Sequence, residues 1–226
     1  MNTLMLGLYA EGRTDERFLP IIIQRTSEKL LIQHDRSNIE ANEPEIIRVR
    51  NSDRYNSKAE RIFAAAHVAY GYHALVIHSD ADDLTYQQAY QERFGPGKEL
   101  LKDQKRACRD LIPIIPVRMV EAWMLADSEA LQKALSIKKN FNFLKRSRQV
   151  ESYTDPKDVL DQVIRAAYPD YPKLWSKLRG KLYAELAPLI RLELLYQVPA
   201  YREFVRELAK TFKFLNLIQE FGDQTF

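Results

Sequence analysis

The sequence predicts an α/β fold with a mostly parallel sheet of about four strands, flanked by helices and followed by a C-terminal helical extension. Strand-like and helix-like patterns alternate through the first 126 residues, which is typical of βαβ units and of a parallel sheet covered on both faces. After about residue 136 the strand-like patterns stop and only helical patterns continue. These two observations define the predicted fold class.

The chain opens with a predicted strand, helix and second strand. Residues 3–10 form a short apolar run, and residues 15–33 carry apolar side chains at helical spacing. Residues 45–49 (EIIRV) are rich in β-branched side chains, which favours a short strand. This order predicts the first βαβ unit.

A helix and a buried strand are predicted next. Residues 57–70 form a helix that opens at Ser57, with Glu60 at the position that a capping box requires. Residues 73–79 read as a buried strand because they are almost wholly apolar. This strand is the third of the predicted sheet.

The remaining part of the predicted core is less regular. Residues 84–109 are expected to be mostly helical, with an interruption at Gly95-Pro96-Gly97. Two prolines within residues 112–117 indicate an edge strand or an irregular strand, since proline cannot donate to a sheet ladder. Residues 119–135 are expected to form one helix.

The C-terminal part is predicted to be helical. A polar loop is expected over residues 136–154, before helices near 155–168, 173–190 and 199–219. We therefore expect an α/β core over residues 1–135 and a helical extension, packed on that core, over residues 136–226.

Composition is ordinary for a soluble globular protein, with 46% hydrophobic and 29% charged residues among 226. The single cysteine, Cys108, excludes an internal disulfide and fits a reducing cytoplasm. Apolar runs stay well below the roughly 18 residues of a membrane span. The N-terminal segment lacks the basic region of a signal peptide. We expect a cytoplasmic protein without a membrane partner.

The net charge of +3 is unevenly distributed. Residues 1–100 hold 12 Lys and Arg against 15 Asp and Glu, whereas residues 101–226 hold 22 against 16. Acidic groups can gather a metal ion and basic groups can gather phosphates.

Acidic residues follow three of the predicted strands. Glu11-Gly12 comes after the first strand, residues 80–83 (Asp-Ala-Asp-Asp) come after the third, and Arg118 and Glu121 come after the last. The carboxyl ends of parallel strands lie at one edge of the sheet, where open α/β sheets bind ligands. We therefore expect these acids to lie near one another.

Clustered carboxylates of this kind are typical ligands for a hard divalent cation. Asp80 and Asp82 are two residues apart, so in extended backbone they point to the same side. Mg²⁺, or Mn²⁺, takes such oxygen ligands and completes its shell with water and phosphate. The alternative at each joint is an acid that only forms a turn or caps a helix.

Four neighbouring residues are expected beside the ligands rather than among them. Gly12 lets the backbone turn, and Asp15, with Thr14 as cap, complements the start of the following helix. Asp83 is expected to cap a helix. His78 is either part of the site or simply buried beside the sheet edge.

A basic loop is the second functional candidate. Its basic residues, with two phenylalanines among them, are expected to bind nucleic acid through phosphates and stacked bases: Lys138, Lys139, Lys145, Arg146 and Arg148. The alternative is a solvated loop whose phenylalanines pack into the core.

The segments EGRTDERFL and VIHSDADD together resemble the Toprim fold of topoisomerases, primases and related nucleases. Its signature is a Glu-Gly after the first strand and an Asp-x-Asp after a later one. The segments PVRMVEAWMLAD and DPKDVL resemble a narrower group, the mainly bacterial domain of unknown function 4276 (DUF4276) family. The resemblance covers most of the chain.

The resemblance implies metal-dependent phosphodiester chemistry on nucleic acid, as in a nuclease. Glu11 would act as general acid/base or as ligand, and Asp80, Asp82 and Glu121 would bind Mg²⁺. Arg118 would meet a phosphate. Toprim nucleases commonly add a lysine, for which the sequence offers no clear counterpart.

Two other functions remain open. The chain could be a non-catalytic module that binds nucleic acid or a partner ATPase, as Toprim-like relatives do in anti-phage defence. A phosphatase or glycosyltransferase Asp-x-Asp fits less well, because aspartyl phosphatases place that motif after the first strand and this motif follows the third.

Overall fold

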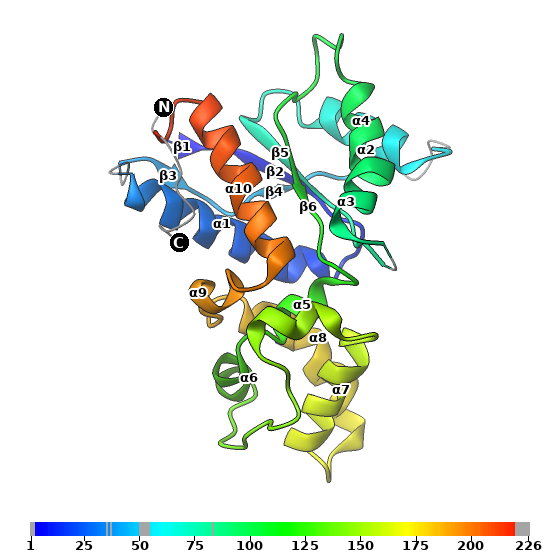
Figure 1. The fold of residues 1–226 in the computed structure, drawn as a ribbon, viewed down its shortest axis with the longest axis vertical. Helices are drawn as coiled ribbons and strands as arrows, with labels where there is room; N and C mark the ends of the chain where they lie inside the picture. The colour runs from blue at the N-terminus through cyan, green and yellow to red at the C-terminus, as the bar shows by residue number, and fades with distance from the viewer. Residues whose placement is uncertain (1–2, 35, 37, 50–54, 83, 220–226) are drawn as a thin grey trace.

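The computed structural model describes residues 3–34, 36, 38–49, 55–82 and 84–219. It confirms the predicted α/β class: a four-stranded parallel sheet lies between layers of helices (Figure 1). Its strand order is β4-β2-β5-β6, with bounds Glu45–Ile46, Leu6–Tyr9, Ala74–His78 and Leu111–Ile114. A separate parallel pair joins β1 (Thr3–Leu4) to β3 (Glu40–Ala41).

The strand order reverses between β2 and β5. β2 enters the middle of the sheet, β4 is added on one side of it, and β5 and β6 follow on the other. Register is continuous across this centre, with Leu8 opposite Val76 and Val76 opposite Ile112. In open α/β sheets such a reversal leaves a crevice at the carboxyl ends of the two central strands.

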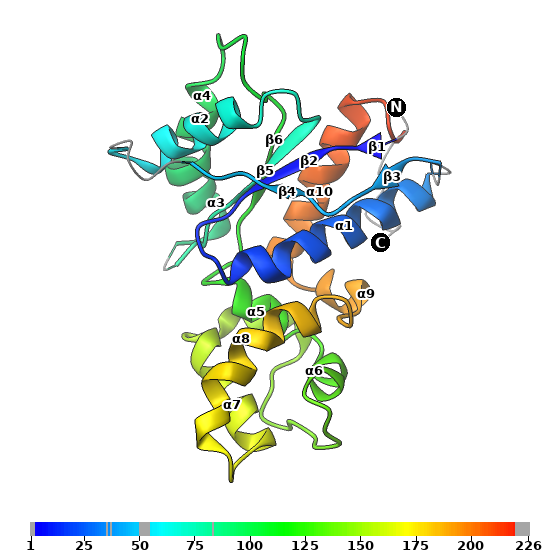
Figure 2. The same cartoon turned by 180° about the vertical axis from the view of Figure 1, so that it is seen from behind.

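Helices cover both faces of the sheet. On one face lie α1 (Asp15–Gln33) and α10 (Pro199–Phe214), over Leu6, Leu8 and Val76. On the other lie α2 (Lys58–Val68), α3 (Tyr86–Ala89), the π-helical turn η1 (Tyr90–Phe94) and α4 (Gly95–Glu99) (Figure 2). Each face therefore has its own apolar cluster.

The remaining helices form a lobe beyond the carboxyl end of the sheet (Figure 1). Their bounds are α5 Val120–Met124, α6 Ser128–Ala134, η2 Ser147–Ser152, α7 Pro156–Ala167, η3 Pro172–Leu174, α8 Trp175–Leu186 and α9 Leu192–Leu195. From this lobe the chain returns through α10 to pack on β6 and α1. One apolar cluster runs from the sheet into the lobe. The division at residue 135 stays a prediction.

Several predicted elements are confirmed. The helix over residues 15–33 has the expected bounds, and Ser57 caps α2 by accepting from the Glu60 backbone N–H. β6, which contains Pro113, is an edge strand as predicted. Among the described residues, no helix is both long and apolar enough to cross a bilayer.

Other expectations were wrong in detail. Residues 84–109 are helical only to Glu99, and Gly95-Pro96-Gly97 begins a helical turn instead of interrupting one. Proline is tolerated there because the first turn of a helix needs no N–H partner. A Cβ on Gly97 would lie 2.7 Å from Ile62 Cβ, so this glycine lets α4 pack closely against α2.

The helix expected over residues 119–135 is two helices. Asp127 ends the run because its carboxylate accepts from the backbone N–H groups of Glu129 and Ala130 and so caps α6. Arg191 binds the same carboxylate at 2.8 Å and ties this break to the segment before α9. The polar loop predicted over residues 136–154 contains the 3₁₀ helix η2.

Candidate functional site

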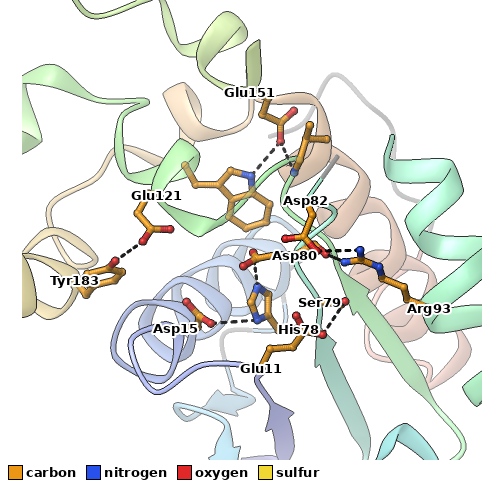
Figure 3. A network of polar contacts seen from close by, with 12 residues as sticks. Glu11, Asp15, His78, Ser79, Asp80, Asp82, Arg93, Glu121, Glu151 and Tyr183 are labelled. Carbon is orange, nitrogen blue, oxygen red and sulfur yellow. Dashed lines mark hydrogen bonds and ion pairs between the residues drawn. The ribbon is translucent and has the colours of Figure 1, made fainter. Parts of the chain in front are cut away.

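The loop after β2 meets the end of β5 at the strand-order reversal. Glu11 Oε1 accepts a hydrogen bond from Ser79 Oγ at 3.0 Å (Figure 3). It also pairs with Lys58 Nζ at 2.6 Å. Lys58 Nζ also lies 3.3 Å from Ser79 Oγ. Three segments far apart in sequence therefore converge at Glu11, and one of them brings a lysine that the sequence analysis did not single out.

His78, the last residue of β5, is buried between two carboxylates (Figure 3). Its Nε2 lies 3.2 Å from Asp80 Oδ1, and its Nδ1 lies 3.5 Å from Asp15 Oδ2. Within the described residues this Nδ1 makes no hydrogen bond. The imidazole thus links the joint after β5 to the first turn of α1.

The electrostatics of this group reflect burial and crowding of like charges. Asp15 is only 7% exposed, and burial raises its pKa to about 6; Asp80 and Glu121 add to the rise, and His78 opposes it. Burial lowers the pKa of His78, but the hydrogen bond and charge of Asp80, with the charges of Asp15 and Glu11, outweigh it and raise the pKa overall. The predicted acids therefore interact with one another.

Gly12 makes room for Asp15. A Cβ at Gly12 would lie 2.7 Å from Asp15 Oδ2, closer than van der Waals contact allows. The backbone of Gly12 is not left-handed, so the sharp turn expected from its sequence position is not the reason for a glycine here. Thr14 precedes α1, as expected, but its side chain makes no capping hydrogen bond.

The structure separates Asp82 from Asp80. Asp82 is 61% exposed, adopts a left-handed backbone (φ +52°) and pairs with Arg93 at 2.9 Å (Figure 3). Arg93 also donates to the backbone carbonyl of Asp80. The two acids of the motif do not point into one site, and a ligand role for Asp82 stays a prediction. Asp83 lies outside the described residues.

The loop after β6 is joined to the loop after β5. Asp82 N donates to the carbonyl of Arg118 at 3.2 Å, and Ala81 N donates to that of Pro116 at 3.0 Å. Arg118 has a left-handed backbone (φ +68°) and lines a shallow hollow at the start of α10. Its phosphate contact stays a prediction.

Glu121, on α5 of the helical lobe, lies close enough to Asp15 for its charge to act on that residue. It is 7% exposed and accepts a hydrogen bond from the Tyr183 hydroxyl of α8 at 2.5 Å (Figure 3). Burial raises the pKa of Tyr183, and the charge of Glu121 with its hydrogen bond raises it further. Tyr183 therefore stays protonated and serves as the donor.

Glu151 stabilises the segment between β6 and α5 through hydrogen bonds. Its carboxylate accepts from Trp123 Nε1 at 3.2 Å (Figure 3). It also accepts from Val117 N at 3.4 Å and from Ala200 N at 3.2 Å. Burial raises its pKa despite these hydrogen bonds. Glu151 thus fixes the joint after β6 to the lobe and to α10.

The predicted nucleic-acid loop lies on the helical lobe. Lys139 Nζ donates to the Ala166 carbonyl at the end of α7, and Lys145 Nζ donates to Ser152 and lies 4.4 Å from the centre of the Tyr153 ring. No contact between the carboxylate group and Lys138, Arg146 or Arg148 occurs within the described residues. Nucleic-acid binding by these five residues stays a prediction.

The arrangement offers oxygen ligands without a finished metal cage. In the described part of the chain, no three His, Cys, Asp or Glu side chains are placed to hold a metal ion by themselves. The carboxylates of Glu11, Asp80 and Glu121 nevertheless come from three separate joints; the charges of Glu11 and Asp80 act on His78, and that of Glu121 acts on Asp15. Mg²⁺ commonly uses one or two carboxylates and completes its shell with water and phosphate oxygens.

Several residues of this site were missed by sequence reasoning. Lys58, Ser79, Arg93 and Tyr183 all contact predicted site residues. Only Lys58 carried a signal: it is a cation in the first turn of a helix, where acidic residues are usually preferred.

A comparison with protein families matches residues 10–208 to the model described as domain of unknown function (DUF4276). No curated protein and no solved structure matches the chain in corresponding comparisons.

Proposed function

The chain belongs to the DUF4276 family, and we propose that its crevice performs Mg²⁺-dependent phosphodiester chemistry on nucleic acid, as a Toprim-like nuclease. One observation carries the proposal. Carboxylates that follow β2 and β5 interact with the buried His78 at the strand-order reversal, and Glu121, which follows β6, interacts with Asp15 beside it. This is the position at which open α/β sheets bind ligands.

The donor set fits a hard divalent cation. Every candidate ligand is a carboxylate, and repulsion from Asp80 and Glu121 contributes to the raised pKa of Asp15. A cation bound to Glu11, Asp80 and Glu121 would relieve this repulsion. When bound, Mg²⁺ or Mn²⁺ supplies Lewis-acid stabilisation of the negative charge on phosphate oxygens.

The residues of the chain take separate roles in this proposal. Glu11 accepts or returns a proton at the reacting oxygen, or serves as a ligand, and Lys58 holds its carboxylate at the crevice. His78 positions Asp80 and Asp15, since it lies between them. Tyr183 positions Glu121 by donating to its Oε1.

The first test is calorimetric titration of Mg²⁺ and of Mn²⁺ into the wild type, Glu11→Gln and Asp80→Asn. A matched control is Asp161→Asn, which removes an acid that pairs with Arg179 at 2.7 Å on the helical lobe. We expect at least about tenfold weaker binding for the two site variants and no change for the control. Asp82→Asn tests whether the exposed partner of Arg93 is also a ligand.

Cleavage is then measured on single- and double-stranded DNA and RNA with the same variants. Loss of cleavage in Glu11→Gln and Asp80→Asn, with their folds intact, supports the proposal. Equal metal binding and equal cleavage by wild type and site variants would refute it. If no metal binds, the titration is repeated with an oligonucleotide present; absence of binding there would favour the non-catalytic module working with an ATPase.

A further inference from the structure

A pocket of about 280 Å³ opens beside the carboxylate group, on the α2 and η1 side of the sheet. Glu11, His78 and Ser79 form its edge toward that group. Apart from Lys58, which holds the Glu11 carboxylate, the proposed metal chemistry does not use the rest of this pocket.

Three cations line the pocket. Lys58 and Arg61 come from the first turn of α2, and Arg93 comes from η1. Of the acidic residues that the structure describes, only Glu11 lines it with them. The pocket wall is therefore cationic next to an acidic cluster.

The position of these cations opposes the stability of the helix. Residues three apart share one face of a helix, so Lys58 and Arg61 repel each other. Both lie near the N-terminal end of α2, where the helix dipole also disfavours positive charge. An anionic ligand would reverse both effects, and it would also meet the N–H groups that a helix directs outward at this end.

Arg93 lies on a π-helical turn, which changes the direction of its side chain relative to a regular helix. Such turns occur often at functional sites. Here the turn brings Arg93 to the Asp80 carbonyl and to Asp82. Its guanidinium thus connects the pocket to the joint after β5.

The floor of the pocket is apolar. Ile62, Ile77, Phe94 and Ile115 line it, with the ring of Tyr9 beside Arg61. The volume lies just below the range of about 300–1,000 Å³ that is usual for small-molecule pockets. A pocket of this size holds one nucleotide unit but not the interior of a duplex.

We propose that this pocket binds the terminal nucleotide of a nucleic-acid strand, with its phosphate on Lys58, Arg61 and Arg93 and its base or sugar on the apolar floor. The inference rests on the proposed function in one respect: the reaction would be the proposed phosphodiester chemistry, and it would take place only at strand ends. Nucleotide binding itself needs no metal, so it can be tested separately.

The test titrates deoxyadenosine monophosphate, deoxyadenosine and inorganic phosphate into the intact protein with EDTA present. The variant is Arg61→Gln, which changes an exposed side chain and leaves the proposed metal ligands in place. The matched control is Arg165→Gln, an arginine on α7 whose guanidinium lies 5.6 Å from the Trp175 ring centre.

We expect the monophosphate to bind at least about tenfold more tightly than either the nucleoside or phosphate alone, because only it makes both sets of contacts. Arg61→Gln should weaken binding of the monophosphate at least about tenfold, and Arg165→Gln should leave that binding unchanged. A linear oligonucleotide should displace the monophosphate, whereas a circular single strand should not.

Equal binding of nucleoside and monophosphate, or no effect of Arg61→Gln, would overturn the inference. Equal displacement by circular and linear strands would exclude a site for strand ends. The nucleotide titration contains no free metal, so it is independent of the metal titration. If the nucleotide binds but no metal binds, this inference stands and the proposed metal chemistry is rejected. If metal binds but the nucleotide does not, only the nucleotide pocket is rejected.

Discussion

Replacement of Asp15 by asparagine should stabilise the protein near neutral pH. Asp15 is 7% exposed, and its pKa is raised to about 6 from the ordinary 3.8, first by burial and then by Asp80 and Glu121. The folded state therefore binds a proton more readily than the unfolded state. Stability falls as pH rises between the two pKa values, and the full cost remains above them.

The two pKa values set the size of the effect. For this carboxyl alone, linkage gives a cost of about 3 kcal/mol at about pH 7.5 and about 1 kcal/mol at about pH 4.5. Asparagine keeps the shape and carries no charge, but it gives up the attraction of His78, which lowers the pKa of Asp15. We expect a net gain of about 1–3 kcal/mol at the higher pH, shrinking toward zero at the lower.

Urea unfolding, followed by circular dichroism in EDTA at both pH values, measures the change. Glu16→Gln is the matched control, because Glu16 lies in the same first turn of α1 and pairs with Arg48 through both carboxylate oxygens. The control removes a favourable interaction with the helix start and should lose about 0.5–1 kcal/mol. The two variants should change the free energy of unfolding in opposite directions, which separates the effect of burial from that of the helix dipole.

One result would refute this reasoning. If Asp15→Asn lowers the free energy of unfolding near neutral pH by more than about 1 kcal/mol, the carboxylate is held by its attraction to His78 and not strained by its neighbours. The same variant should also weaken Mg²⁺ binding if Asp15 contributes negative charge to the crevice.

Two further variants test the packing that supports the site. Asp127→Ala should cost about 1–3 kcal/mol in urea unfolding, because it removes the cap of α6 and the partner of Arg191, whose side chain is 46% exposed. The loss should shrink at acidic pH, since hydrogen bonds from Arg191 hold the pKa of Asp127 low against the effect of burial. Gly97→Ala should lower the melting temperature through a loss of about 1–3 kcal/mol, because its methyl group would meet Ile62 at 2.7 Å; an unchanged midpoint would show that α4 can move away from α2.

The sequence was sufficient for the α/β class and for the joints at which the candidate acids lie. Short apolar runs identified β2, β5 and β6, and their parallel arrangement puts the joints that hold Glu11, Asp80 and Glu121 at the carboxyl end of the sheet. This worked because the carboxyl ends of parallel strands meet whatever the lengths of the crossovers between them.

Orientation of the side chains could not be read in the same way. Asp80 and Asp82 were expected to point together in extended backbone, but the left-handed conformation at Asp82 turns its carboxylate to Arg93. That conformation depends on hydrogen bonds to the loop after β6, including Asp82 N to the Arg118 carbonyl. A contact between two joints has no signal in the local sequence.

Long-range partners were missed for the same reason. Tyr183 on α8 reaches Glu121 on α5, 62 residues earlier, and Lys58 on α2 reaches Glu11 in the loop after β2. Neither position has a motif. The break at Asp127 was also hidden, since its cap is completed by Arg191 from a segment 64 residues away.

The strand-order reversal divides the crevice into two electrostatic halves. On the α1 and lobe side lie Asp15, Asp80 and Glu121, whose mutual repulsion calls for a cation. On the α2 side lie the three cations of the pocket, two of which already pair with the acids Glu11 and Asp82. Glu11 belongs to both halves, since it contacts Ser79 at the end of β5 and Lys58 on α2. A metal-bound phosphate is the single ligand that would bring a cation to the first half and an anion to the second.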